Sequence, residues 1–225
     1  MNNTYPVNPI PPVVICLCAV IVLVEVVLSM AGAGLIGGAQ GIGWRSAAIQ
    51  DYGFAPSVWA QMLERSDYSV DILKRFITYS FVNPSTTQAI FGTVMVLALG
   101  KFVGDVFHPL AVLAVFFLAA IIGAAVYGAT VTPNVGLVGA YPAAYGLIGA
   151  FTYLQWLRLG RMGQNQLQAF RMIGFLMAFQ LLFAVLFGGS PTWVADITGF
   201  GTGLVLSTIV APGGWAAFMR RMRAR

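Results

Sequence analysis

Six long apolar runs constrain this chain more than any other feature of its sequence. They cover about 12–36, 76–100, 106–128, 140–158, 169–188 and 193–211. A helix of about 20 residues crosses a bilayer core of roughly 30 Å, so each run is long enough for one crossing. The runs do not alternate between apolar and polar residues, as the strands of a membrane barrel do. The sequence therefore predicts an all-α, polytopic membrane protein in which residues 1–225 form a single six-helix domain.

The charge content excludes a soluble fold. Only 8% of the 225 residues are charged, whereas about 25% is usual in soluble domains. These few charges cannot cover a water-facing surface. The formal net charge is +5, but the basic residues form no patch interleaved with aromatic residues, so we expect no nucleic-acid partner. Membrane lipid is the expected surrounding.

The distribution of basic residues predicts an orientation. Six crossings place both termini on one side, together with the second-to-third and fourth-to-fifth connections. That side holds one acidic residue, Asp105, and most of the basic ones. The basic residues on it are Lys101, Arg158, Arg161, Arg171, Arg220, Arg221, Arg223 and Arg225. By the positive-inside rule this side is the cytoplasm. The sole histidine, His108, is then expected at a cytoplasmic helix end rather than in a catalytic or metal site.

Two stretches lie outside the predicted crossings. The first loop, about 37–73, combines scattered charges with aromatic side chains, which is typical of short helices lying at the lipid headgroups. Its aromatic residues include Trp44, Tyr52, Phe54, Trp59 and Tyr68. Four basic and four acidic residues cancel within the connection between the first two runs. The basic tail, 212–225, is expected to anchor the chain at an anionic membrane surface.

Three short segments carry recognisable patterns. Residues 193–203 read WVADITGFGTG, with Gly199 and Gly203 four residues apart. Such a stripe of small residues lets a neighbouring helix approach closely in lipid. Residues 139–150 read GAYPAAYGLIGA and are similarly rich in small residues, and residues 75–83 read RFITYSFVN.

In this order, the three segments resemble the rhomboid family of intramembrane serine proteases. The family pattern Gly-x-Ser-Gly, followed by Gly-Leu-x-Gly, corresponds to 139–150. The pattern Ala-His-x-x-Gly-x-x-x-Gly corresponds to 195–203. The pattern Arg-x-x-Thr-x-x-Phe-x-His, followed by His four residues before Asn, corresponds to 75–83 and then to Gln88 and Gly92. The resemblance covers nearly the whole chain and implies a six-helix bundle with a bulky first loop. Its compact form is most similar to bacterial members, which implies a bacterial inner membrane.

The positions that would carry the family's chemistry depart from its pattern. The nucleophile position holds Tyr141 and the general-base position holds Asp196. Gln88 and Gly92 replace the histidine and asparagine that help to stabilise the oxyanion. Acyl transfer needs an activated hydroxyl, a base near neutral pKa and donors aimed at the developing charge. The resemblance therefore implies a catalytically inactive member, a rhomboid pseudoprotease.

Two acidic residues fall inside predicted crossings, where a carboxylate is costly and needs a partner. Because the fourth and sixth helices face each other in the family, we expect the Tyr141 hydroxyl to bond the Asp196 carboxylate as a structural clasp. Glu25 is predicted near the middle of the first crossing. It is interpreted as a protonated glutamate bonded to a nearby backbone or hydroxyl group, or alternatively as a contact for a client helix.

The sequence thus predicts a protein that binds transmembrane segments of client proteins and affects their assembly or turnover, the kind of role that inactive rhomboids and derlins imply. No cofactor and no metal ion is expected. One alternative is a divergent active protease that uses another serine, namely Ser80, Ser85, Ser190 or Ser207. Two further alternatives are a small transporter that uses Glu25 and Asp196, and an accessory subunit of a membrane complex.

Overall fold

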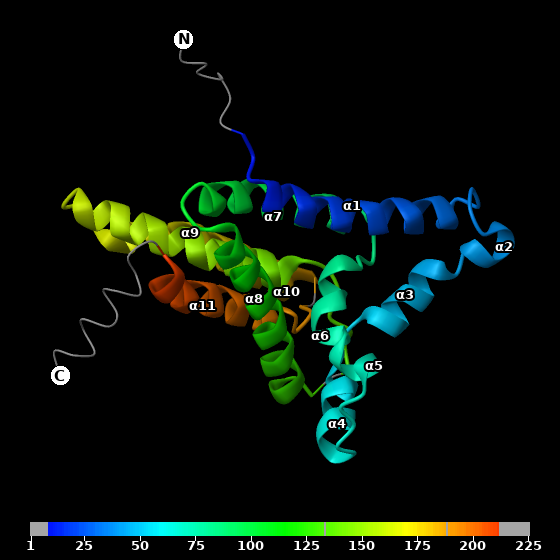
Figure 1. Ribbon diagram of the computed structural model, residues 1–225. Coiled ribbons are helices and arrows are strands. Elements are labelled where there is room, and N and C mark those ends of the chain that lie inside the picture. The colour runs from blue at the N-terminus through cyan, green and yellow to red at the C-terminus, as the bar shows by residue number, and fades with distance from the viewer. Residues whose placement is uncertain (1–8, 133, 188, 212–225) are drawn as a thin grey trace, which may run out of the picture.

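The computed structural model describes residues 9–132, 134–187 and 189–211. The predicted basic tail, 212–225, lies outside these residues. All regular elements in the described ranges are helices (Figure 1). The chain is therefore all-α over these ranges, as the apolar runs predict.

Within the described ranges, four helices are long and apolar enough to cross a membrane. They are α1 (Pro12–Gly32), α7 (Thr86–Gly104), α8 (Pro109–Thr130) and α11 (Trp193–Val210). Two further long helices are α9 (Tyr141–Arg161) and α10 (Arg171–Phe187). The count of six crossings stays a prediction, because α9 and α10 do not reach the same length and hydropathy within the described residues. In α9 the C-terminal half lowers the mean hydropathy, because it contains Gln155, Arg158 and Arg161.

The second apolar run is not one helix, as its predicted range 76–100 implied. Its first part forms α6 (Arg75–Thr78) and the 3₁₀ helix η1 (Tyr79–Phe81), and the long helix α7 begins only at Thr86. Pro84 accounts for the break, because a proline disfavours helical backbone at the residue before it. Ser85 then caps α7, since its hydroxyl accepts a hydrogen bond from the Gln88 amide at 3.3 Å.

The segment between α1 and α7 is longer than the predicted first loop of 37–73, because α1 ends at Gly32 rather than at residue 36. Besides α6 and η1, it contains four short helices. These are α2 (Gly38–Gly41), α3 (Trp44–Tyr52), α4 (Pro56–Glu64) and α5 (Val70–Leu73). In Figure 1 this segment extends away from the bundle of long helices. Phe54 ties it back, since it pairs with Leu137 through two backbone hydrogen bonds of 3.1 and 2.6 Å.

The bundle is organised around α9. Helices α7, α8 and α11 pack against α9, and α1 lies along α7 (Figure 1). The closest approach is between α9 and α11. A Cβ atom at Gly203 would overlap the Gly146 carbonyl oxygen, and one at Gly199 would overlap the Pro142 carbonyl oxygen. The stripe of small residues thus lies where α11 meets α9.

Candidate functional site

The residues at the family's nucleophile and base positions lie where three helices meet. Tyr141 opens α9, and Asp196 lies in the first turn of α11. Between them, Gly123 of α8 is packed so that an added Cβ would lie 3.1 Å from the Ala195 carbonyl oxygen and 3.3 Å from the Pro142 Cβ. Since Pro142 follows Tyr141 and Ala195 precedes Asp196, the two candidate positions are brought together.

The start of α7 and the segment before it add to the same region. Asn83 is only 1% exposed, and its Oδ1 lies 3.1 Å from where a Gly139 Cβ would stand. Neither polar atom of the Asn83 amide has a hydrogen-bond partner among the described residues. Gly92 faces Ala140, with 3.8 Å between an added Cβ and the Ala140 Cβ. Gln88, one turn earlier on α7, is exposed.

Asp196 has a different partner from the predicted one. Its side chain is 4% exposed, and its Oδ2 accepts a hydrogen bond of 3.0 Å from Nε2 of Gln180 on α10. Among the described residues, Tyr141 makes no hydrogen bond to Asp196, so the predicted clasp is wrong. Gln180 lies on the facing side of α10 and supplies the donor that the buried carboxylate needs.

No serine is paired with Asp196 in the described part of the chain. Ser207 donates to the Gly203 carbonyl at 2.6 Å. Ser85 and Ser190 accept hydrogen bonds from nearby backbone amides. Ser80 is fully buried, and its hydroxyl has no partner among the described groups.

The only histidine is far from this region. His108 is the N-cap of α8, where its Nδ1 accepts a hydrogen bond of 3.3 Å from the Leu110 amide. Gly123, the α8 residue that contacts Ala195, lies about 15 residues further along α8, which is roughly 22 Å at 1.5 Å per residue. His108 therefore lies at a helix end, as predicted, and cannot act as a base for a group beside Asp196.

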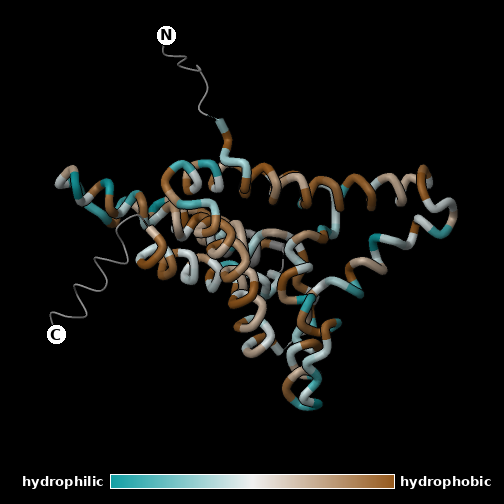
Figure 2. The backbone as a smooth tube through the Cα atoms, viewed as in Figure 1, coloured by the Kyte–Doolittle hydropathy of each residue, from teal (hydrophilic) through white to brown (hydrophobic). Residues whose placement is uncertain are grey.

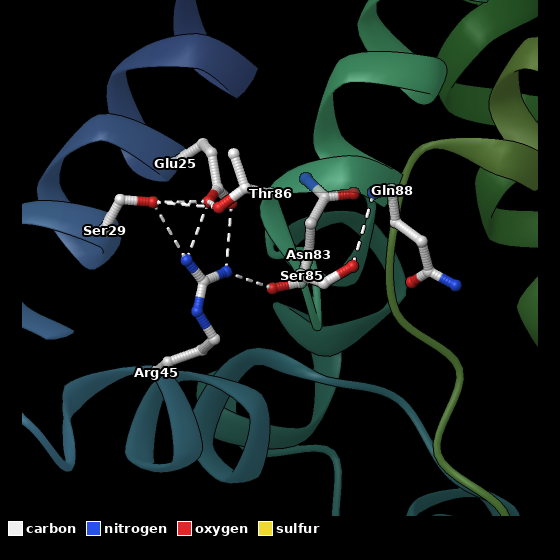
Figure 3. A network of polar contacts seen from close by, with 7 residues as sticks. All are labelled: Glu25, Ser29, Arg45, Asn83, Ser85, Thr86 and Gln88. Carbon is white, nitrogen blue, oxygen red and sulfur yellow. Dashed lines mark hydrogen bonds and ion pairs between the residues drawn. The ribbon is translucent and has the colours of Figure 1, made fainter.

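Glu25 is part of an ion pair. Its Oε1 and Oε2 accept hydrogen bonds from Nη2 and Nη1 of Arg45 at 2.7 and 3.0 Å. The hydroxyls of Ser29 and Thr86 donate to Oε1 at 2.7 and 2.8 Å (Figure 3). Two parallel hydrogen bonds from one guanidinium group to both oxygens are typical of an ionised carboxylate. The prediction of a protonated glutamate is therefore wrong.

The position of Glu25 is close to the predicted one. In α1, which ends at Gly32, Glu25 lies three residues past the centre of the helix and seven residues, or about 10 Å, from its end. Arg45 comes from α3, beyond that end, and reaches the carboxylate from there (Figure 3). Glu25 is 7% exposed and is engaged within the chain, which argues against the alternative prediction of a contact with a client helix.

The Glu25 network is connected to the candidate site through Asn83. Nη1 of Arg45 also donates a hydrogen bond of 2.8 Å to the Asn83 backbone carbonyl. This bond fixes the backbone of the residue whose side chain lies against Gly139. In Figure 3 the Gln88 side chain points away from the network, on the other side of the α7 cap. The network therefore joins α1, α3 and the start of α7, and positions Asn83.

Sequence reasoning missed Gln180, Arg45 and Asn83. A signal existed for Gln180, because it is the only strongly polar residue between Arg171 and Phe187. A lone polar side chain within an apolar helix usually faces a partner inside the bundle. No comparable signal marks Arg45, since a charge in a polar loop ordinarily needs no partner.

Mutation can show whether Gln180 or Tyr141 is the partner of Asp196. Gln180→Leu leaves a buried carboxylate without its donor, which costs about 1–3 kcal/mol. A loss of that size lowers the melting temperature by roughly 2–12 °C in a chain of this length. Tyr141→Phe removes only a hydroxyl and is expected to leave the melting temperature in detergent within about 2 °C, a change of under about 1 kcal/mol. A larger loss for Tyr141→Phe than for Gln180→Leu would restore the tyrosine clasp.

Groups of acidic, histidine and cysteine side chains that could hold a metal ion are not found within the described residues. Cys16 and Cys18, which lie in α1, are free thiols, the first exposed and the second buried. The candidate site is thus a polar region formed by the buried Asp196 and Asn83 and the partly buried Tyr141 and Gln180.

Comparison with known proteins gives one positive result. The model of the Rhomboid domain matches residues 71–213, which span α5 to α11 and include every position of the candidate site. A comparison with curated proteins finds no significant match. Because the matched segment covers more than half of the chain, this membrane protein belongs to the rhomboid family.

Proposed function

We propose that the protein is a non-proteolytic rhomboid that binds transmembrane helices of client proteins and affects their assembly or turnover. The absence of proteolysis, the first part of this proposal, rests on the burial and the hydrogen-bond partner of Asp196. At the position of the family's general base, a buried carboxylate accepts a hydrogen bond from Gln180. No serine hydroxyl in the described part of the chain is hydrogen-bonded to this carboxylate, so the pair of nucleophile and base that acyl transfer needs is not formed there.

The second part of the proposal is supported by α10. Its apolar side chains Phe175, Phe179, Leu182 and Leu186 are 70, 51, 52 and 62% exposed. Their spacing of four, three and four residues places them along one stripe of the helix. Within a membrane such a stripe can face lipid or another apolar helix. Gln180, near the middle of α10, donates a hydrogen bond to Asp196, so a client helix on the exposed face of α10 would be separated from the candidate site by this one helix.

Proteolysis can be tested directly on the full-length protein. We expect no labelling by a fluorophosphonate probe and no cleavage of a model transmembrane substrate in liposomes. An active rhomboid protease assayed in parallel shows that both reagents work. Labelling that a single change, such as Ser80→Ala, abolishes would contradict the proposal and identify a divergent protease.

Helix binding can be mapped by photo-crosslinking. A photoreactive amino acid replaces Leu182 on α10 or, as a matched control, Leu23 on the exposed face of α1, which is 63% exposed. The probe is a synthetic single-span helix of leucine and alanine with one central asparagine, reconstituted with the protein in liposomes. We expect at least fivefold more crosslinking at Leu182. Equal yields at the two positions, or a higher yield at Leu23, would contradict binding beside α10.

The orientation is part of the proposal. We infer that the ends of α7 and α9, with Lys101, Arg158 and Arg161, face the cytoplasm of a bacterium, because basic residues are retained on that side of the inner membrane. In a background without Cys16 and Cys18, a cysteine at Ser66 is expected to react with an impermeant maleimide in spheroplasts. A cysteine at His108 is expected to react only after permeabilisation. The reverse pattern would invert the topology.

A further inference from the structure

A groove with an apolar part and a basic end lies along the C-terminal half of α9. Its volume is about 670 Å³. Phe102 of α7 and Val106, two residues past the end of α7, form one wall, and α9 forms the other. The main α9 residues that line it are Phe151, Leu154, Gln155, Arg158 and Arg161. Their spacing of three, one, three and three residues places them on one face of the helix.

The lining changes character along the groove. Phe151 and Phe102 form its apolar part, with their ring centroids 5.5 Å apart. Arg161 lies ten residues after Phe151, which is roughly 15 Å along α9. Figure 2 shows hydrophilic residues gathered at this end of α9, beyond a largely hydrophobic stretch. The groove thus presents apolar surface toward the middle of the bundle and two guanidinium groups at its end.

The positive charge of this end is not balanced within the described chain. Neither Arg158 nor Arg161 has an acidic partner within ion-pair distance among the described residues. Asp105, which caps the end of α7 next to Val106, forms an ion pair with Lys101 at 3.3 Å. Guanidinium groups bind phosphate oxygens through pairs of parallel hydrogen bonds. A ligand that matches the groove therefore has a phosphate at one end and an apolar chain at the other.

We propose that this groove is a binding site for one anionic phospholipid. Its phosphate lies between Arg158 and Arg161, and an acyl chain lies against Phe102, Phe151 and Leu154. A zwitterionic lipid fits less well, because its ammonium group would be placed beside two guanidinium groups. Basic pockets between transmembrane helices recognise anionic headgroups through the same pairing.

The test is native mass spectrometry of the delipidated full-length protein in mild detergent. The probes are phosphatidylglycerol and phosphatidylcholine with identical acyl chains. We expect the wild type to retain phosphatidylglycerol at least fivefold more than phosphatidylcholine. R158Q/R161Q is expected to lose this preference, with phosphatidylglycerol binding reduced at least fivefold. Arg171→Gln is the matched control, because Arg171 is exposed on the adjoining helix and lies outside the groove.

Each other outcome overturns the assignment. An unchanged preference in R158Q/R161Q, or an equal loss in Arg171→Gln, would place the lipid elsewhere. Displacement of the bound lipid by glycerol phosphate would show that the groove binds a free phosphate. A dimer that dissociates in R158Q/R161Q would assign the groove to a second copy of the chain. Both arginines are exposed, so the double variant is expected to melt at the wild-type temperature.

Discussion

Gly203→Ala is expected to destabilise the protein by at least about 3 kcal/mol, although it adds a single methyl group. The new Cβ would overlap the carbonyl oxygen of Gly146 and lie 2.6 Å from its carbonyl carbon. These are backbone atoms of α9, so no side chain can rotate away, and the two helices must separate. Overpacking of this kind typically costs 1–3 kcal/mol and more where the backbone must move. The expected fall in melting temperature is about 6–12 °C, measured in detergent by a thermal shift assay.

Gly201→Ala is the matched control for this prediction. Gly201 lies two residues earlier on the same helix, and a Cβ there would meet nothing within 4 Å. Because alanine favours helix over glycine by up to about 1 kcal/mol, this variant is expected to be unchanged or slightly more stable. If Gly203→Ala had the same melting temperature as Gly201→Ala, α9 and α11 would not be in close contact at Gly203.

The same contact shows what the sequence could predict. The spacing of Gly199 and Gly203 indicates a close helix approach, and α11 meets α9 at both glycines. Apolar runs likewise locate the long helices to within a few residues, except at the start of α7. There residues 83–88 read NPSTTQ and contain no strongly apolar side chain, and α7 begins only at Thr86. This polar stretch and Pro84 were a signal of the break, because a proline disfavours helical backbone at the residue before it.

Partners of buried polar groups could not be predicted in the same way. The expected facing positions of Tyr141 and Asp196 favoured a hydrogen bond between these two residues, but Gln180 is the residue that donates to Asp196. Which side chain reaches a carboxylate depends on the rotation of each helix about its own axis, and a hydropathy pattern does not fix that rotation. The partner of Arg45 was also missed. The charge count cancelled Arg45 against acidic residues of its own loop, whereas its ion pair is with Glu25 of α1.

Glu25→Leu is expected to destabilise the protein by about 2–4 kcal/mol, because it leaves the Arg45 guanidinium without its counter-ion. Removing one member of a buried ion pair typically costs 3–5 kcal/mol. A smaller cost is expected here because the Arg45 side chain is 22% exposed and can still reach water. Two hydroxyls, of Ser29 and Thr86, also lose their acceptor. The melting temperature should fall by roughly 4–16 °C.

The double variant E25L/R45L distinguishes a specific ion pair from a general need for polar residues. When both charges are replaced together, no unpaired charge remains, so much of the lost stability should return. A double-mutant cycle from Glu25→Leu, Arg45→Leu and E25L/R45L should give a coupling energy of about 1–3 kcal/mol. Asp71→Asn is the control for an exposed pair, since the Asp71 side chain is 80% exposed beside Lys74. Its melting temperature should not change measurably.

The cycle also tests whether the network positions Asn83. Because Arg45 donates to the Asn83 carbonyl at 2.8 Å, E25L/R45L regains stability but lacks the bond that holds this backbone. We therefore expect the double variant to fold and yet to lose at least half of its crosslinking to the model helix at position 182. Recovery of both stability and crosslinking would show that the ion pair only stabilises the fold. Recovery of neither would show that Leu cannot replace the pair, and would contradict the predicted coupling.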